Sequence, residues 1–440
     1  ELNTPVYLVG GAVRDLLMGF LVEKDFDLVM EAQLLKAVHL LAQKVGGSFF
    51  PLSLTPLNYR VVLRQNNQKL EIDFSELRGS NLYEDLLNRD FTINAIALKL
   101  NDLFGKNKEI PLYDPLGGKE DLKKRTLRVA SPASFDQDPL RILRAIRIVR
   151  ECQLQLEPQT RAKIIQQKEL LLSVSEERVR SEFFKLLSFP EAQKSFQWLE
   201  ELGLLSLLLP EKPPDIKPGL EIVKRCEWAL DHLTDIFPEF SERVKNHLEE
   251  EIEESITRKS LFKLAAFLVA KKKVFSQEKA LAWVEKLSQR FKLGKKARMI
   301  LKKMIKFSPQ LLFKNEINCF YPRVLFQLLR KVESEMIEIM LLSWADYLQQ
   351  INEPLGSRED FRTRKWLNYL LDYYFNEYPL SRPLISGQDI MVKFGLNEGK
   401  IVGKLLNQVA LMEAEGKLHT SEEAIQYVEN YLREKDYFKS

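Results

Sequence analysis

The chain has 440 residues, more than one hydrophobic core usually organises, so several domains are expected. Its composition, 45% apolar and 29% charged with only 18 Gly and 19 Pro, is typical of a helix-rich globular protein rather than a loop-rich β protein. No apolar stretch approaches the roughly 18 residues of a membrane-spanning helix, which excludes a membrane protein and favours a cytoplasmic location.

The cysteines and histidines indicate neither a disulfide framework nor a zinc site. Cys152, Cys226 and Cys319 are widely separated, and the four histidines are scattered without metal-ligand spacing. We therefore expect buried thiols in a reducing compartment.

In chain order, the first part mixes short strands and helices. Patterns rich in β-forming residues occur at residues 6–9, 25–30, 59–64 and 70–74, with helical periodicity at residues 13–18 and 32–45. After Asp138 the pattern is almost wholly helical. The sequence predicts an α+β head followed by a long helical remainder.

The first motif is a strand that runs into Gly10 and Gly11, directly before a helix that carries Arg14. Glycines at such a turn let backbone N–H groups approach a phosphate, and the helix N-terminus favours an anion. The same turn is also common as a purely structural connection, so alone it does not decide the function.

Two carboxylates follow. Asp25 and Asp27 lie at i and i+2 of a predicted strand and so share one face, with Phe26 and Leu28 directed to the core. Adjacent like charges are stabilised by a cation, and carboxylate oxygens suit Mg²⁺. Phosphoryl transfer uses two such ions, one at the attacking oxygen and one at the leaving oxygen. A third carboxylate is expected on a neighbouring strand, where Glu71 and Asp73 share a face.

The motifs taken together resemble the class II tRNA nucleotidyltransferase/poly(A) polymerase family. Besides the glycine turn and the Asp25/Asp27 pair, the similarity rests on residues 89–95 (Arg-Asp-Phe-Thr-Ile-Asn-Ala), 113–118 with 126–128, 137–144, and 177–182. These stretches follow the family's order over residues 6–187. Beyond residue 210 the resemblance is looser until residues 385–403.

The resemblance implies a polymerase-β-type nucleotidyltransferase head at residues 1–127, followed by an all-α neck (128–209), body (210–330) and tail (331–440). The head would transfer a nucleotide from CTP or ATP to a tRNA 3′-hydroxyl without a template, using Mg²⁺ held by Asp25 and Asp27. Asp73 is favoured as the third catalytic carboxylate because it keeps the family's five-residue step to Arg78.

The same resemblance implies a set of nucleotide-binding residues. Arg89 and Asp90 would hold the ribose and triphosphate, together with Gly10, Gly11 and Arg14. Asn94 would fix the backbone near the site, although a cap or a buried polar contact explains it equally well. Residues 137–144, which end at Arg144, match the family's nucleotide-selecting motif.

Within that motif, Asp138 and Arg141 are expected at i and i+3 of a helix and hence on one face. The carboxylate accepts hydrogen bonds and the guanidinium donates them, which matches the edge of cytosine. Without the preceding motifs, an ion pair on a helix surface would be the default interpretation.

The sequence departs from the family pattern at three places. Gln137 stands where the family has Glu, and Asn88 where it has the first Arg of an Arg-Arg-Asp motif. The family's flexible basic loop is reduced to residues 79–81. Because a family enzyme without that loop resembles the CC-adding type, we expect addition of two cytidines, with a separate A-adding enzyme acting afterwards. A full CCA-adding enzyme, a poly(A) polymerase or A-adding enzyme, and a non-catalytic RNA-binding relative are the alternatives.

A basic segment in the helical part is the candidate tRNA contact. Residues 286–315 contain ten Lys or Arg and no Asp or Glu, whereas residues 248–255 contain five Glu. Phosphate contacts provide affinity without sequence reading, as recognition of every tRNA requires. The candidate RNA-binding residues are Lys295, Lys296, Arg298, Lys302 and Lys303. A solvated helix face is the alternative.

Overall fold

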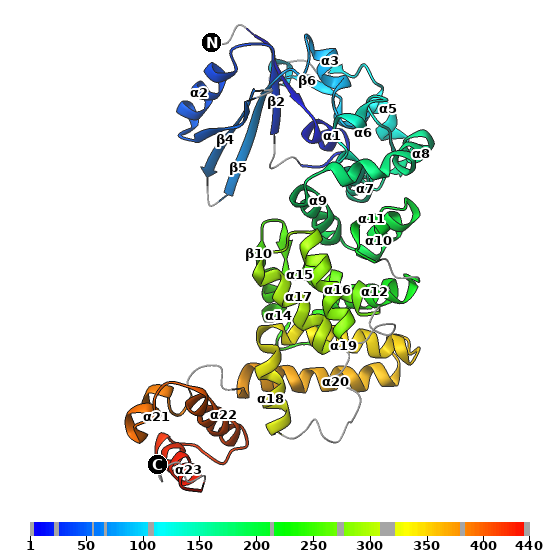
Figure 1. The fold of residues 1–440 in the computed structure, drawn as a ribbon. Helices are drawn as coiled ribbons and strands as arrows, with labels where there is room; N and C mark the ends of the chain where they lie inside the picture. Colours follow the sequence, from blue (N-terminus) through cyan, green and yellow to red (C-terminus); the bar gives the residue numbers. More distant parts are fainter. Residues whose placement is uncertain are drawn as a thin grey trace. The chain divides into compact units, whose positions relative to one another are not determined.

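The protein is described from a computed structural model (Figure 1). The structure describes residues 4–21, 26–54, 57–65, 68–103, 110–211, 215–270, 277–308, 322–378 and 383–434. The chain forms two compact units, one of residues 1–189 with 194–209 and one of residues 190–193 with 210–440.

The first unit begins with a seven-stranded mixed sheet of order β3-β4-β5-β2-β1-β6-β7. The strands are β1 (Val6–Val9), β2 (Phe26–Met30), β3 (Ser48–Leu54), β4 (Leu57–Gln65), β5 (Gln68–Glu76), β6 (Ala97–Lys99) and β7 (Leu112–Tyr113). Strands β2 and β5 are parallel, and the other neighbours are antiparallel.

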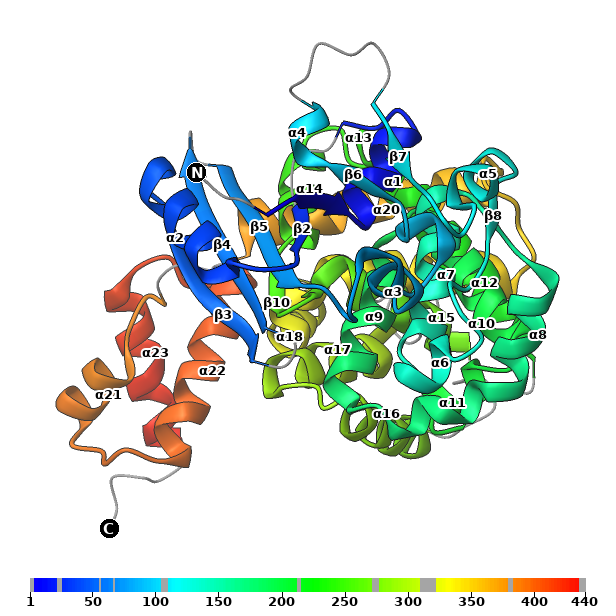
Figure 2. The same ribbon diagram turned by 90° about the horizontal axis from the view of Figure 1, so that it is seen from above.

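The two faces of the sheet differ in what covers them. Leu28 and Met30 pack in one core with residues of helices α1 (Gly11–Leu17) and α2 (Leu34–Val45). Val29 lies in a second core on the other face, together with Leu86 of helix α3 (Leu82–Leu87). Both views show α2 beside β4 (Figures 1 and 2). Because side chains alternate along a strand, Asp27 is on the face opposite α2.

The rest of this unit is a set of short elements and helices. They are η1 (Thr92–Asn94), α4 (Leu100–Leu103), α5 (Gly118–Lys123), β8 (Thr126–Leu127), α6 (Ser134–Gln137), α7 (Arg141–Cys152), β9 (Gln155–Leu156), α8 (Pro158–Gln167), η2 (Lys168–Ser173), α9 (Glu176–Ser188), α10 (Ala192–Glu201) and α11 (Leu205–Leu208). Helices α7 and α9 pack against each other. The predicted α+β head followed by helices is confirmed.

The second unit is almost entirely helical. It contains α12 (Lys217–Asp231), α13 (Leu233–Ile236), α14 (Ser241–Leu248), β10 (Glu251–Glu253), β11 (Ile256–Thr257), α15 (Arg258–Val269), α16 (Gln277–Arg290), α17 (Lys295–Phe307), α18 (Pro322–Val332), η6 (Glu333–Glu335), α19 (Met336–Gln350), α20 (Arg358–Asp372), η7 (Tyr373–Glu377), α21 (Gly387–Phe394), α22 (Lys400–Ala414) and α23 (Ser421–Glu434).

The expected start of the tail at residue 331 does not coincide with a change in packing. Helix α19 packs against α12, α15 and α17, the helices of the body. A separate core begins only at Ile385 and runs to Leu432. Helix α19 is buried around nearly its whole circumference, which explains why it belongs with the body. The other expected domain boundaries stay predictions.

Two expectations from composition can be compared with the structure. Cys152 and Cys226 are buried free thiols, as expected, and burial raises the pKa of Cys152 to about 11. Cys319 lies outside the described residues. Within the described part of the chain, no helix is long and apolar enough to cross a membrane.

Candidate functional site

The predicted catalytic carboxylates lie on two adjacent parallel strands. Asp27 of β2 is in register with Asp73 of β5, so both side chains point to the same face of the sheet. Arg60 of β4 binds both oxygens of Asp73, with nitrogen–oxygen distances of 2.7 and 2.9 Å, and contacts Glu71 at 2.7 Å. Asp25 lies outside the described residues.

The glycine turn places backbone directly against Asp27. Gly10 has φ 74° and ψ −144°, and helix α1 begins at the next residue. A Cβ atom at Gly10 would lie 2.8 Å from Oδ2 of Asp27 and 3.5 Å from Nη1 of Arg89. The turn, the carboxylate and the guanidinium therefore meet at one point, and only glycine leaves room for them.

We predict that Gly10→Ala strongly reduces catalysis, because the new methyl group displaces the Asp27 carboxylate. Gly19→Ala is the matched control: Gly19 has φ 80°, yet a Cβ there meets nothing within 4 Å. Both changes place an alanine at positive φ, but Gly10, with ψ −144°, has a conformation that is essentially restricted to glycine, so its variant should have the lower melting temperature. Turnover, measured well below both melting temperatures, should fall only in Gly10→Ala. Equal turnover in the two variants would contradict the close approach of Gly10 to the Asp27 carboxylate.

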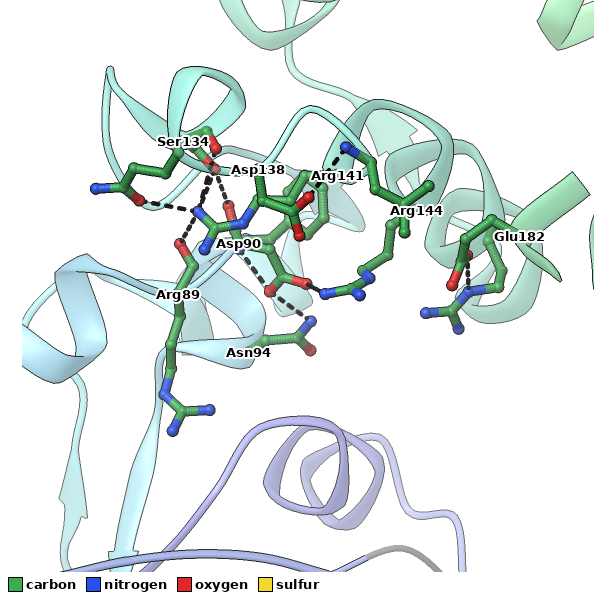
Figure 3. Close-up of polar contacts among 12 residues, drawn as sticks. Arg89, Asp90, Asn94, Ser134, Asp138, Arg141, Arg144 and Glu182 are labelled. Atoms are coloured by element: carbon green, nitrogen blue, oxygen red, sulfur yellow. Dashed lines mark hydrogen bonds and ion pairs between the residues drawn. The ribbon is translucent and has the colours of Figure 1, made fainter. Parts of the chain in front are cut away.

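A chain of buried polar contacts connects the glycine turn to the helical part of the unit. Nη1 of Arg14 donates to Oδ1 of Asn94 at 3.2 Å, and Nδ2 of Asn94 donates to Oδ1 of Asp90 at 3.0 Å. Nη1 of Arg144 donates to Oδ2 of Asp90 at 3.2 Å. Figure 3 shows Asp90 with Asn94 and Arg144 beside it. Asn94 is thus a buried polar link between Arg14 and Asp90, and its role at the nucleotide stays a prediction.

Asp90 is held as a carboxylate by these neighbours. Burial alone raises the pKa of its carboxyl, but the charge of Arg144, the hydrogen bond from Asn94 and the charge of Arg141 outweigh burial. The pKa of Asp90 consequently lies below its usual value. Burial lowers the pKa of Arg144, but the charges of Asp90 and Glu182 raise it by more.

The prediction that Asp138 and Arg141 share a helix face is wrong. Asp138 has an extended backbone, with φ −149° and ψ 98°, and helix α7 begins only at Arg141. Pro139 follows Asp138 and disfavours a helical conformation there. Both residues still line the same pocket.

The Arg141 guanidinium makes most of its hydrogen bonds to other groups of the protein. Its side chain is buried and donates to the backbone oxygens of Asn88 (2.7 Å), Arg89 (3.2 Å) and Ser134 (3.3 Å). It also donates to the Gln137 side-chain oxygen at 3.2 Å, a contact with a neutral partner.

The cation that contacts Asp138 is Arg178 of helix α9. Its Nη2 lies 3.1 Å from each oxygen of the Asp138 carboxylate. The Arg178 side chain is 52% exposed and that of Asp138 23%. This pairing across 40 residues of sequence was not predicted.

These groups surround a pocket of about 570 Å³. The predicted residues that line it are Gly10, Gly11, Arg14, Asp27, Arg89, Asp90, Asn94, Asp138, Arg141 and Arg144. Asp73, on the next strand, is not among its lining residues. The concentration of arginines at one pocket suits a polyphosphate.

Sequence reasoning missed several lining residues, including Arg147, Glu151 and Arg178. The signal for Arg147 was available, because it continues the three-residue step of Arg141 and Arg144 along α7. Arg147 donates to Glu182 at 2.9 Å, which fixes α9 against α7.

The basic helix α17 is largely paired with acidic residues of its own unit. Lys296 contacts Glu250 at 2.7 Å, and Arg298 and Lys302 contact Glu285 at 2.9 and 2.5 Å. Lys303 contacts Glu333 and Glu335 at 2.5 and 2.8 Å. Lys295 is exposed at the start of the helix. The adjacent acidic and basic segments of the sequence thus partly neutralise each other, and RNA binding by these residues stays a prediction.

No cluster of three or more His, Cys, Asp or Glu side chains with the arrangement of a metal site occurs among the residues that the structure describes. Asp27 nonetheless supplies hard oxygen donors at the pocket edge, in the register expected for a metal-binding carboxylate. Such oxygen donors fit a divalent metal ion.

A mixed sheet with carboxylates on neighbouring parallel strands, and a glycine turn that places Asp27 beside an arginine-lined pocket, has the features that the sequence predicts for a nucleotidyltransferase. The model of the poly A polymerase head domain matches residues 6–128, and that of the probable RNA and SrmB-binding site of polymerase A matches residues 153–213. The chain belongs to the tRNA nucleotidyltransferase/poly(A) polymerase family and is an enzyme of that family.

Curated relatives match over nearly the whole chain. The CC-adding tRNA nucleotidyltransferase of Geobacter sulfurreducens is 31% identical over 96% of this chain and 91% of its own length. The A-adding tRNA nucleotidyltransferase of Deinococcus radiodurans is 30% identical over 97% and 95%. The solved apo form I of a CCA-adding enzyme covers 98% of this chain and 91% of its own, with a TM-score of 0.70 and 24% identity, and so shares the fold.

Proposed function

We propose that this enzyme transfers two CMP residues from CTP to the 3′ end of tRNA that lacks CCA, releasing one pyrophosphate with each transfer, and that it leaves the terminal A to a separate A-adding enzyme. The observation that carries the proposal is the short connection at residues 79–81, between β5 and α3. The family resemblance implies that a flexible loop at this place serves the addition of A.

The short connection is held at both ends by hydrogen bonds. The backbone N–H and the hydroxyl of Ser80 donate to Glu84 at 2.8 and 2.9 Å, and the Asn81 side chain caps α3 by accepting from the N–H of Glu84. Gly79 has φ 152°, and a Cβ there would lie 2.5 Å from Cβ of Glu84. A segment so short and so well bonded is suited to a fixed position rather than to a change of position between nucleotides.

The other two departures from the family pattern contact each other. Nε2 of Gln137 donates to Oδ1 of Asn88 at 3.0 Å. Nδ2 of Asn88 donates to the backbone oxygens of Arg78 (2.6 Å) and Glu84 (3.0 Å). Asn88 thereby connects the short segment to the selecting motif through three hydrogen bonds. A connection of this kind holds the two in one arrangement, as a pocket for one nucleotide requires.

The relatives are consistent with this proposal without deciding it. Besides the Geobacter protein, the enzymes of Synechocystis and Thermus thermophilus, 26% and 28% identical, are named CC-adding. An A-adding relative and CCA-adding relatives also match. Solved structures of the same fold include CCA-adding enzyme complexes with CTP, with ATP and with tRNA.

The proposed chemistry assigns roles to the chain's own residues. Asp25 and Asp27 would hold Mg²⁺, which lowers the charge repulsion between the 3′-oxygen and the phosphate. Asp73, in register with Asp27 on the neighbouring strand, would be the third catalytic carboxylate. Arg89 would contact the triphosphate, because it lies beside the Gly10 turn. Asp138 would accept from the amino group of cytosine.

Binding of the tRNA would use phosphate contacts from α17. Lys295 and Lys296, both exposed, are the residues best placed to contact a phosphate, whereas Lys303 is mostly enclosed by Glu333 and Glu335. Because lysine contacts to RNA phosphates release bound counterions, the affinity for tRNA would fall as the salt concentration rises.

The proposal is tested by supplying single nucleotides to several RNAs. The protein should extend tRNA ending at the discriminator base with CTP alone and should leave unstructured RNA unextended. Repeated addition of A to any RNA would instead indicate a poly(A) polymerase, and A addition confined to tRNA ending in CC would indicate an A-adding enzyme. Binding of tRNA without extension by any nucleotide would indicate a non-catalytic relative.

A further inference from the structure

Asp138, which precedes helix α7, is oriented in the pocket by a residue of helix α9. Nη2 of Arg178 lies 3.1 Å from both carboxylate oxygens, and the N–H of Leu140 donates to Oδ1 at 3.3 Å. A single nitrogen that bridges both oxygens restricts rotation of the carboxylate plane. The neighbouring contact of Arg147 with Glu182, one turn along α9 from Arg178, fixes the position of that helix.

Arg141 does not supply this restraint. Its guanidinium donates to the backbone of Asn88, Arg89 and Ser134 and to the Gln137 side chain, and its side chain is buried. Arg178, by contrast, is half exposed and lines the pocket. An exposed arginine can move when a ligand competes for the carboxylate.

We propose that Arg178 is a specificity-determining residue. It holds the Asp138 carboxylate in the plane that accepts the amino group of cytosine, and it gives up part of its contact with that carboxylate when CTP binds. The proposal rests on the role of Asp138 given under the proposed function. Arg178 acts through Asp138 and is therefore a positioning residue.

The discrimination follows from the chemistry of the two pyrimidines. Cytosine presents a hydrogen-bond donor at N4, whereas uracil presents an acceptor oxygen at the same place. A carboxylate that is fixed in one plane accepts from the donor and repels the oxygen. A carboxylate that rotates freely loses much of this difference, because it can turn away from uracil O4 and allow water between them.

The test compares CTP and UTP in single-nucleotide addition to tRNA ending at the discriminator base. Arg178→Ala should lower the ratio of kcat/KM for CTP to that for UTP by about tenfold, the size of one well-made base contact. The fall in the ratio should come from a higher KM for CTP together with a higher kcat/KM for UTP. Arg178→Lys should recover part of the ratio, since an ammonium keeps the charge but not the planar fork.

Arg161→Ala is the matched control, because it removes an arginine of similar exposure, which contacts Glu201 at 3.8 Å, from helix α8 of the same unit. Its selectivity and melting temperature should equal those of the parent. If Arg178→Ala lowered kcat/KM equally for CTP and UTP, or left both unchanged, so that their ratio stayed at the parental value, the proposal would be overturned. If the parent itself adds no CMP, the proposed function fails, whereas normal CMP addition with an unchanged ratio in the variant removes this inference alone.

Discussion

Asp27→Asn is expected to abolish nucleotide transfer while the protein stays folded. Asparagine has the size of aspartate but lacks its charge, and Asp27 faces the pocket beside the Gly10 turn. Loss of a charge that stabilises the transition state lowers turnover by about a thousandfold, or about 4 kcal/mol. Single-turnover CMP addition to tRNA measures this loss, and tRNA binding at equilibrium should remain near the parental value.

The control for this change is Glu71→Gln. Glu71 lies on the same strand face as Asp73 and contacts Arg60, yet it is not expected to take part in the chemistry. Its turnover should stay within severalfold of the parent, whereas Asp73→Asn should lose most activity. Near-normal turnover in Asp27→Asn would refute the assignment of this strand as the metal-binding strand. If turnover were lost in Glu71→Gln and retained in Asp73→Asn, Glu71 rather than Asp73 would be the third catalytic carboxylate.

Arg141→Ala is expected to destabilise the first unit. The backbone oxygens of Asn88, Arg89 and Ser134 would lose a donor in a buried place. A buried group left without its partner costs about 1–3 kcal/mol, so we expect a free energy of unfolding lower by about 3 kcal/mol. Urea unfolding of the variant and the parent measures the difference.

The same variant separates a structural role of Arg141 from a purely base-reading one. Selectivity for CTP should also fall, because residues 88–89 and 137 lose their common partner. The half-exposed Arg161 again provides a control, for which the change should stay within about 0.5 kcal/mol. Parental stability of Arg141→Ala, combined with lost selectivity, would show that its bonds to the backbone are unimportant.

The parts of the site that follow from local periodicity could be predicted from the sequence. The alternation of Asp27 with Phe26 and Leu28 predicts which face carries the carboxylate, and the packing of Leu28 with α1 and α2 agrees. The short segment between Asp73 and Arg89 could be predicted in the same way, because its length and its capping residue Asn81 are both local.

The contacts that depend on packing could not be predicted. Asp138 meets Arg178 only because α7 and α9 pack together, and residue spacing carries no signal for that approach. The basic helix was interpreted without its partners: Glu285 lies on the preceding helix, and Glu250 comes from the acidic segment. A run of like charges in the sequence does not predict which opposite charges pack against it in the folded protein.

The pH dependence of the site follows from Asp90. Because its folded-state pKa is lowered, its ion pair contributes stability that is present above the ordinary carboxyl pKa and is lost as the pH falls through the lower folded-state value. Protonation of Asp90 should therefore not limit nucleotide binding at neutral pH.

The central claim is tested most directly by the length of the product. Purified protein is incubated with CTP and ATP together and tRNA that ends at the discriminator base, and the 3′ ends are resolved at single-nucleotide resolution. The short, bonded segment at residues 79–81 predicts that extension stops after two cytidines, even with ATP in excess. Subsequent addition of an A-adding enzyme should then complete the end. Efficient formation of CCA by this protein alone would contradict the CC-adding assignment.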